Sequence, residues 1–226
     1  MIKAIIFDLD NTLLDFMKMK SVSINAAVNG MINAGMTINK AESIDEIYSI
    51  YDTKGYEHQE VFNEFIVNTL GEINFKFLAA AIVEYKKAKE KSLNLYDDVF
   101  PTLNKLLDMG LRLGIVSDAP SREAWIRLYT LMLHNKFEHV VTFNDTGFHK
   151  PAKEPFLKIS EKLNLKLNEC MMVGDWPERD IEGAKQVGMK TAFAKYGSTE
   201  DVLDSGADHD LNSLSELINI VKKYNN

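Results

Sequence analysis

The chain has 226 residues, of which 46% are hydrophobic and 26% are charged, and its formal net charge is −7 at pH 7. This composition is typical of a soluble globular protein, and the negative charge argues against nonspecific binding to nucleic acid or anionic membranes. Cys170 is the only cysteine, which excludes an intrachain disulfide and a zinc–thiolate cluster. We see no signal peptide and no apolar run of the roughly 18–20 residues that a membrane span needs, so we expect a cytoplasmic protein.

The first predicted element is a β-strand that ends at a pair of acidic residues. The apolar run 5–7 leads directly into the sequence Asp8-Leu9-Asp10-Asn11-Thr12. Because alternate residues of a strand share a face, Asp8 and Asp10 should point the same way. Two neighbouring carboxylates repel each other unless a cation lies between them, and Mg²⁺ is usually held by one or two carboxylates plus substrate phosphate. By itself the pair also fits solvated strand-end carboxylates or the metal site of a nucleotide-sugar transferase.

Residues 15–95 have the hydrophobic period of helices and contain no convincing strand. Apolar residues at the spacing i, i+3, i+4 and i+7 form stripes in four segments, 24–31, 44–51, 62–70 and 78–85. Ser43 and Glu46 have the spacing of a capping box, which predicts that the second helix starts there. We therefore expect an all-helical insertion with four helices.

After residue 95 the chain alternates between strand and helix patterns. The predicted strands are 111–117, 139–143, 170–174, 190–194 and 207–211. The predicted helices are 102–109, 122–134, 154–163, 178–187 and 213–224. This alternation predicts an α/β fold: a Rossmann-like, mostly parallel sheet covered by helices. Its core would comprise residues 1–14 and 96–226, with the helical domain 15–95 inserted.

Ligands of such sheets gather beyond the carboxyl ends of the strands. The polar residues that follow the later strands are Ser117, Asp118, Lys150, Asp175 and Asp180. With Asp8 and Asp10 they supply carboxylates for a cation, a hydroxyl and one lysine, the groups that phosphoryl transfer needs. Each has a simpler interpretation when taken alone, such as a helix cap for Ser117 or a surface lysine for Lys150. Their joint order at strand ends favours a site.

In this order the residues closely resemble the haloacid dehalogenase superfamily, and the resemblance covers the whole chain. The family's Asp-x-Asp-x-Thr motif matches residues 8–12, and its strand-end Ser or Thr matches Ser117. Its loop lysine, often followed by proline, matches Lys150-Pro151, and its Gly-Asp-x-x-x-x-Asp motif matches residues 174–180. The helical insertion is similar to the family's mobile cap. The resemblance implies a magnesium-dependent phosphatase, a phosphoric monoester hydrolase that works through an aspartyl-phosphate.

The resemblance also implies a role for each matching residue. Asp8 would be the nucleophile, Asp10 the general acid and base, and Ser117 and Lys150 would contact the phosphoryl group. An aspartate with a reference pKa of about 3.9 is already ionised at pH 7 and needs no base to activate it.

The cofactor implied is Mg²⁺, for which Mn²⁺ or Co²⁺ could substitute. Its ligands would be Asp8, Asp175 and the backbone carbonyl of Asp10, while Asp180 would hold a metal-bound water or orient Lys150. The expected substrate is a small phosphorylated metabolite. Its contacts would come from Asn11, Ser117, Asp118 and Lys150.

Two positions depart from the common family pattern. Asp118 replaces a frequent Asn or Gly, and Trp176-Pro177 stands where small polar residues are usual. Two other functions stay open: a haloacid dehalogenase, which usually lacks an acid at the position of Asp10, and a phosphate-binding protein without turnover. We expect no nucleic-acid or membrane partner, and a monomer or small homo-oligomer.

Overall fold

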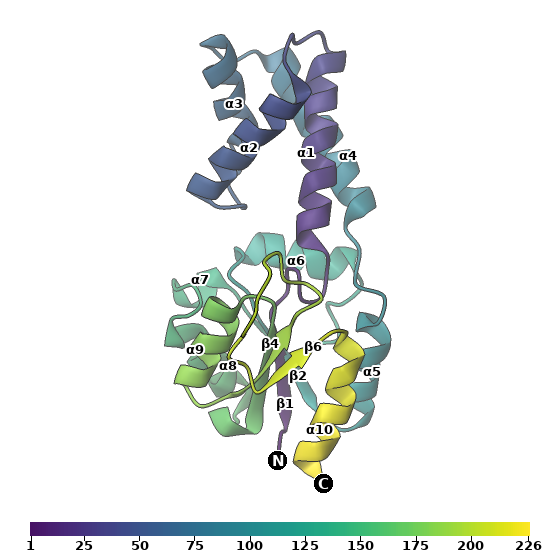
Figure 1. Ribbon diagram of the computed structural model, residues 1–226, viewed down its shortest axis with the longest axis vertical. Coiled ribbons are helices and arrows are strands. Elements are labelled where there is room, and N and C mark those ends of the chain that lie inside the picture. Colours follow the sequence, from purple (N-terminus) through teal and green to yellow (C-terminus); the bar gives the residue numbers. More distant parts are fainter. The chain divides into compact units, whose positions relative to one another are not determined.

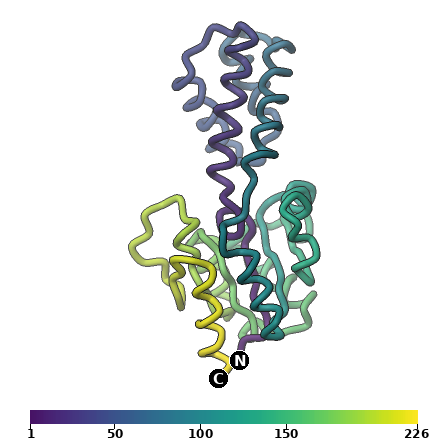
Figure 2. The backbone as a smooth tube through the Cα atoms, turned by 90° about the vertical axis from the view of Figure 1, so that its right-hand side faces the viewer, coloured from purple at the N-terminus to yellow at the C-terminus, as the bar shows by residue number.

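A computed structural model describes residues 1–226 and divides the chain into two compact units. The core unit consists of Met1–Asp15 and Leu95–Asn226, and the helical unit of Phe16–Asn94. These limits differ by one residue at each end from the insertion 15–95 expected from the sequence. Figures 1 and 2 show the chain in two views.

The core unit is built on one six-stranded sheet in which every strand pair is parallel. Its order is β3-β2-β1-β4-β5-β6. The strands are β1 (Ala4–Phe7), β2 (Arg112–Val116), β3 (His139–Val141), β4 (Cys170–Gly174), β5 (Lys190–Ala194) and β6 (His209–Leu211). The predicted α/β, Rossmann-like fold is therefore confirmed.

The central strands are buried on both sides, which explains their continuous apolar sequences. Every residue of β1 and β4 is buried. Helices α8 (Lys153–Leu163) and α9 (Glu182–Gln186) cover one face, and α5 (Val99–Asp108) and α10 (Leu217–Asn225) cover the other (Figure 1). Ile6 and Met172 pack with Phe156 and Ile159 of α8 in a buried cluster on the first face. Helix α6 (Ser121–Thr130) connects β2 to β3.

Several core elements differ from their predicted form; the predicted helix 122–134, for example, ends at Thr130. The predicted strand 139–143 stops at Val141, because Thr142 is the N-cap of the short helix α7 (Phe143–Thr146). The backbone N–H and the hydroxyl of Thr142 both bond to the Asp145 carboxylate, at 2.8 and 2.9 Å. The predicted helix 178–187 begins with a π-helical turn, Pro177–Ile181, and continues as α9.

The helical unit contains α1 (Phe16–Asn33), α2 (Lys40–Lys54), α3 (Val61–Leu70) and α4 (Phe75–Ser92). Most residues of the predicted stripes lie in its buried core, which includes Ile24, Ala27, Val28, Met31, Ile47, Phe65 and Ala81, whereas Leu70 and Ile82 are exposed. The predicted capping box is wrong: α2 begins at Lys40, and the Asn39 side chain accepts a bond from the Ala41 N–H at 2.9 Å. The Ser43 hydroxyl instead donates to the Asn39 carbonyl, as hydroxyls inside a helix commonly do to the preceding turn.

Backbone and side-chain contacts join the ends of the two chain segments that make up the core unit. At the point where the helical unit is inserted, Leu14 forms an antiparallel bridge with Leu95, and the Tyr96 N–H donates to the Leu13 carbonyl at 3.2 Å. The two termini also meet (Figure 2), where Asn225 bonds to both backbone groups of Ile2.

None of the helices has the length and apolar character required to span a bilayer.

Candidate active site

The candidate residues lie at the carboxyl ends of neighbouring strands in the core sheet. Asp8 follows β1, Ser117 follows β2 and Asp175 follows β4. The chain order reverses between β1 and β4, which is the switch point where open α/β sheets bind their ligands. Lys150 comes from the loop before α8, and Asp180 from the π-helical turn after β4. The fold therefore brings together groups that lie far apart in the sequence.

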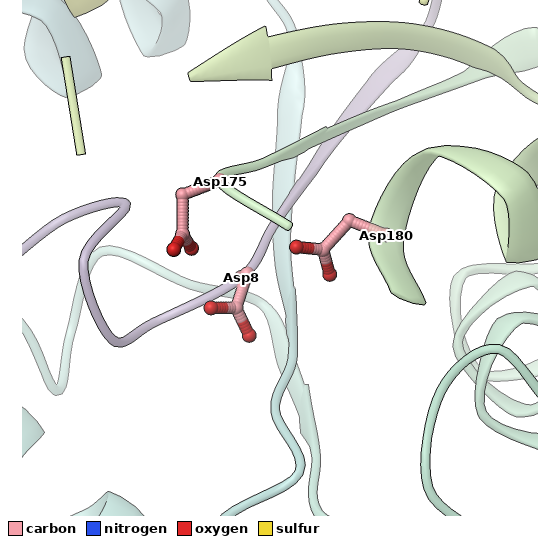
Figure 3. A group of neighbouring side chains, drawn as sticks. All are labelled: Asp8, Asp175 and Asp180. Carbon is pink, nitrogen blue, oxygen red and sulfur yellow. The ribbon is translucent and has the colours of Figure 1, made fainter. Parts of the chain in front are cut away.

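Three of the carboxylates form a buried acidic cluster. One oxygen each of Asp8, Asp175 and Asp180 lies within 4.8 Å of the others. Figure 3 shows the three carboxyl groups approaching one another from the β1 end, the β4 end and the adjacent helical turn. Asp180, which the sequence predicts to act indirectly, is one of the three converging carboxylates.

The Lys150 ammonium lies against this cluster. Its Nζ is 2.5 Å from Asp8 Oδ1 and 2.6 Å from Asp180 Oδ1, and it donates to the Val116 carbonyl at 3.1 Å. Although burial favours the neutral amine, Asp180 and Asp8 outweigh it and raise the pKa of Lys150. Lys150 is therefore a permanent positive charge beside the expected nucleophile.

One lysine does not balance three carboxylates. Burial, together with repulsion from Asp180, raises the pKa of Asp175 to about 7. Burial also raises the pKa values of Asp8 and Asp180, against the attraction of Lys150. Desolvated carboxylates that repel one another are the donor set that a hard divalent cation prefers. The residues present thus fit the magnesium site that the sequence predicts.

These pKa shifts predict how stability depends on pH and metal. With no cation, the folded protein binds more protons than the unfolded chain, whose aspartates have a pKa of about 3.9. The cluster's contribution to stability is therefore fully present below about pH 4 and is lost as the pH rises through about 7, the value for Asp175. Since metal binding needs the ionised carboxylates, Mg²⁺ should raise the melting temperature more at about pH 8 than at about pH 5.5. Thermal unfolding with Mg²⁺ and with chelator, at each pH, measures the change in melting temperature that the metal causes. Equal changes at the two pH values would contradict the prediction.

Several contacts orient the acidic cluster. The Thr12 hydroxyl donates to Asp175 Oδ1 at 3.0 Å, and the Trp176 N–H donates to Asp180 Oδ2 at 3.1 Å. Only glycine fits at position 174, because the Asp180 side chain lies against its backbone and a Cβ there would be 2.3 Å from the Asp180 carboxyl carbon. The threonine and glycine of the two sequence motifs thus hold the carboxylates rather than react.

Asp10 is placed differently from the three clustered carboxylates. Its Oδ2 accepts a bond from Arg127 Nη1 at 2.8 Å, and its side chain is 22% exposed. Asp10 is not among the three residues whose side-chain oxygens converge. Its carboxylate is therefore directed to a different partner from that of Asp8. Arg127 is a residue that the sequence analysis missed.

Asp118 links two loops beside the site. Its Oδ1 accepts the Lys150 N–H at 2.9 Å, and its Oδ2 accepts from Arg179 Nη1 at 3.3 Å. The Arg179 guanidinium lies 3.9 Å from the Trp176 ring centroid. The two departures from the family pattern, Asp118 and Trp176, are therefore connected through Arg179. The expected substrate contact of Asp118 stays a prediction.

Ser117 and Asn11 are fixed by their local backbone. The buried Ser117 hydroxyl accepts the Ala119 N–H at 3.2 Å. Asn11 has a left-handed backbone with φ of 57°, and a Cβ at Gly197 would lie 1.6 Å from the Asn11 carbonyl oxygen. Tyr196 donates its hydroxyl to the next carbonyl, that of Thr12, at 2.7 Å. Sequence analysis missed this support from the loop after β5, which no recognisable motif marks.

Comparison with known proteins agrees with this geometry. The sequence profile described as Haloacid dehalogenase-like hydrolase matches residues 5–194. The chain belongs to the haloacid dehalogenase-like hydrolases. The family and the hydrolase class expected from the sequence are thereby confirmed.

Several relatives of this haloacid dehalogenase-like hydrolase are named glyceraldehyde 3-phosphate phosphatase. The protein from Methanocaldococcus jannaschii is 34% identical over 98% of each chain. That from Methanopyrus kandleri is 31% identical and covers 99% of this chain and 98% of its own. A crystal structure of a HAD phosphatase from Thermococcus onnurineus has a TM-score of 0.73 and 26% identity, covering 97% of this chain and 98% of its own. These relatives support the expected class, a phosphoric monoester hydrolase.

Proposed function

We propose that this protein is a magnesium-dependent phosphatase that hydrolyses a small phosphorylated metabolite through an aspartyl-phosphate on Asp8. The observation that carries the proposal is the Lys150 ammonium, buried 2.5 Å from Asp8 Oδ1 inside a cluster of carboxylates. This arrangement places a positive charge, the Lys150 ammonium, directly beside an oxygen nucleophile, the Asp8 carboxylate. Charge fixed in advance beside a reacting phosphoryl group is the main way that proteins stabilise phosphoryl transfer.

The first chemical step transfers the phosphoryl group to Asp8. A carboxylate oxygen of Asp8 forms a bond to phosphorus while the bond to the ester oxygen breaks, and the electron pair leaves with that oxygen. Asp10 donates its proton to the departing oxygen, which becomes an alcohol. Lys150 offsets the repulsion between the Asp8 carboxylate and the phosphate dianion, and the Ser117 hydroxyl donates to a phosphate oxygen.

The second step returns the enzyme to its starting state. A water molecule attacks phosphorus, its proton passes to the Asp10 carboxylate, and the bond between phosphorus and Asp8 breaks. Asp10 therefore acts as an acid in one step and as a base in the next. Proton transfers of this kind are typically worth about 10²–10⁴ in rate.

The acidic cluster supplies the residues that would hold Mg²⁺. Asp8 and Asp175 are the expected ligands with the Asp10 carbonyl, and an oxygen of Asp180 lies within 4.8 Å of both carboxylates. When bound, the cation would neutralise charge on the phosphate oxygens and on Asp8. Thr12 and the Trp176 N–H hold Asp175 and Asp180 in the orientation that the cluster needs.

The substrate class that we propose is a triose phosphate, with glyceraldehyde 3-phosphate as the preferred member. Its support is the 34% identity over 98% of both chains to a relative with that named activity. We expect the purified protein to hydrolyse glyceraldehyde 3-phosphate with a higher kcat/KM than dihydroxyacetone phosphate or glycerol 3-phosphate. All turnover, including that of para-nitrophenyl phosphate, should need Mg²⁺, Mn²⁺ or Co²⁺ and stop in excess chelator.

Product analysis makes this test specific. Triose phosphates also lose phosphate by elimination without hydrolysis, so glyceraldehyde should be measured along with free phosphate. The same assay with the Asp8→Asn protein is the matched blank. Full activity in chelator, or halide release from 2-haloacids without phosphatase activity, would favour a dehalogenase. Phosphate binding without turnover would identify a binding protein.

A further inference from the structure

Arg127, on α6 of the core unit, is a buried arginine. Its side chain is only 1% exposed, whereas that of Arg122, on the same helix, is 72% exposed. A guanidinium keeps its charge at all accessible pH values, and burying a charge is costly unless it is paired. The Nη1 of Arg127 donates to Asp10 Oδ2 at 2.8 Å. The buried Arg127 cation therefore pairs with Asp10, the residue to which we assign both proton transfers.

We propose that Arg127 is a positioning residue that holds the Asp10 carboxylate in the orientation required for proton transfer. The inference rests on the proposed function, because it assumes that Asp10 is the acid and base. Asp10 follows the strand rather than lying within it, and its side chain is partly exposed. An aspartate in such a place has torsional freedom, yet misplacing a reacting group by about 1 Å can cost 10²-fold in rate. A bond from a buried, rigid donor removes that freedom.

The geometry also distinguishes the two oxygens of Asp10. Arg127 bonds to Oδ2, and an oxygen that accepts from a guanidinium carries the negative charge and is a poor place for a proton. Oδ2 is therefore the less suitable of the two oxygens to carry the transferred proton, both toward the leaving oxygen and away from the attacking water. Arg127 acts through Asp10 and needs no contact with the substrate.

The test compares variants of Arg127 on two substrates. Arg127→Met keeps an unbranched, buried side chain without its charge, and Arg127→Lys keeps the charge with fewer donors. With an alkyl phosphate, kcat of Arg127→Met should fall about 10- to 100-fold, a part of the acid–base contribution, while KM changes about twofold or less. With para-nitrophenyl phosphate, whose leaving group needs no proton, the loss should fall on the second step, so that phosphorylated enzyme accumulates. Arg122→Met, on the exposed arginine, is the control and should behave like wild type.

A double-mutant cycle with Asp10→Asn separates positioning from a structural effect. If Arg127 acts through Asp10, then adding Arg127→Met to Asp10→Asn should lower kcat by no more than about twofold. Additive losses, or a wild-type kcat in folded Arg127→Met, would overturn the inference. If Arg127→Met does not fold, Arg127→Lys decides: it should show the same dependence on leaving group with a smaller loss, and a wild-type kcat would refute positioning. A wild-type protein with no phosphatase activity would defeat the proposed function as well, whereas an active wild type with unaffected variants defeats the positioning alone.

Discussion

Asp8→Asn is expected to reduce phosphatase turnover by about 10⁴-fold or more, as removal of a covalent nucleophile does. The variant keeps the size of the side chain but loses the anionic oxygen that would bond to phosphorus. It should stay folded without metal, because burial raises the pKa of Asp8 and its ionised form is the costly one. Intact-mass spectra of rapidly quenched reactions measure the covalent step, and the variant should show no added phosphoryl group.

Asp10→Asn is the matched control for this experiment. It keeps the backbone carbonyl and the side-chain size but cannot exchange a proton. With para-nitrophenyl phosphate the first step should suffer less than the second, so a phosphoryl adduct should accumulate. An adduct in the Asp8 variant would mean that another residue is the nucleophile.

Replacing Lys150 by methionine should separate catalysis from metal binding. The buried ammonium is within 2.6 Å of both Asp8 and Asp180. Its loss should lower kcat by about 10²–10³, the usual cost of removing one group that stabilises developing charge. Metal affinity should change in the opposite direction, because the carboxylates lose the positive charge that competes with a cation.

Stability measurements complete the Lys150 test. Breaking a buried ion pair leaves uncompensated charge and costs about 3–5 kcal/mol, and divalent metal should recover much of this loss. Calorimetric titration with Mn²⁺ gives the affinity, and thermal unfolding with and without metal gives the stability. Lys153→Met is the control, since Lys153 is exposed at the start of α8. If Lys150→Met weakened Mn²⁺ binding while staying folded, our account of the electrostatics would be wrong.

The sheet and the aspartates at the ends of β1 and β4 were predictable because both follow local patterns. Continuous apolar runs define β1 and β4, and the first polar residue after each of them is an aspartate at the ligand-binding edge. Parallel topology then requires these ends to meet. Asp8 and Asp175 could therefore be placed together without any knowledge of their distance.

The supporting contacts could not be predicted in this way. Arg127 reaches Asp10 from a helix whose sequence does not reveal the partner of its buried charge. The close approach of Gly197 to Asn11 joins segments with no shared motif. The π-helical turn that carries Asp180 has the composition of an ordinary helix start. Each of these depends on tertiary packing, which a hydrophobic period does not encode.

The position of β1 in the sheet has a consequence for the order in which the protein is assembled. This strand is made first, yet it lies between β2 and β4 and pairs with residues 112–115 and 170–173. The helices of the helical unit, by contrast, pack into a compact unit made of the continuous segment Phe16–Asn94. Local contacts form quickly and distant strand pairs form slowly, and chains fold domain by domain during synthesis. The strand that precedes Asp8 therefore pairs only after most of the polypeptide has been made, and the site is among the last parts of the molecule to form.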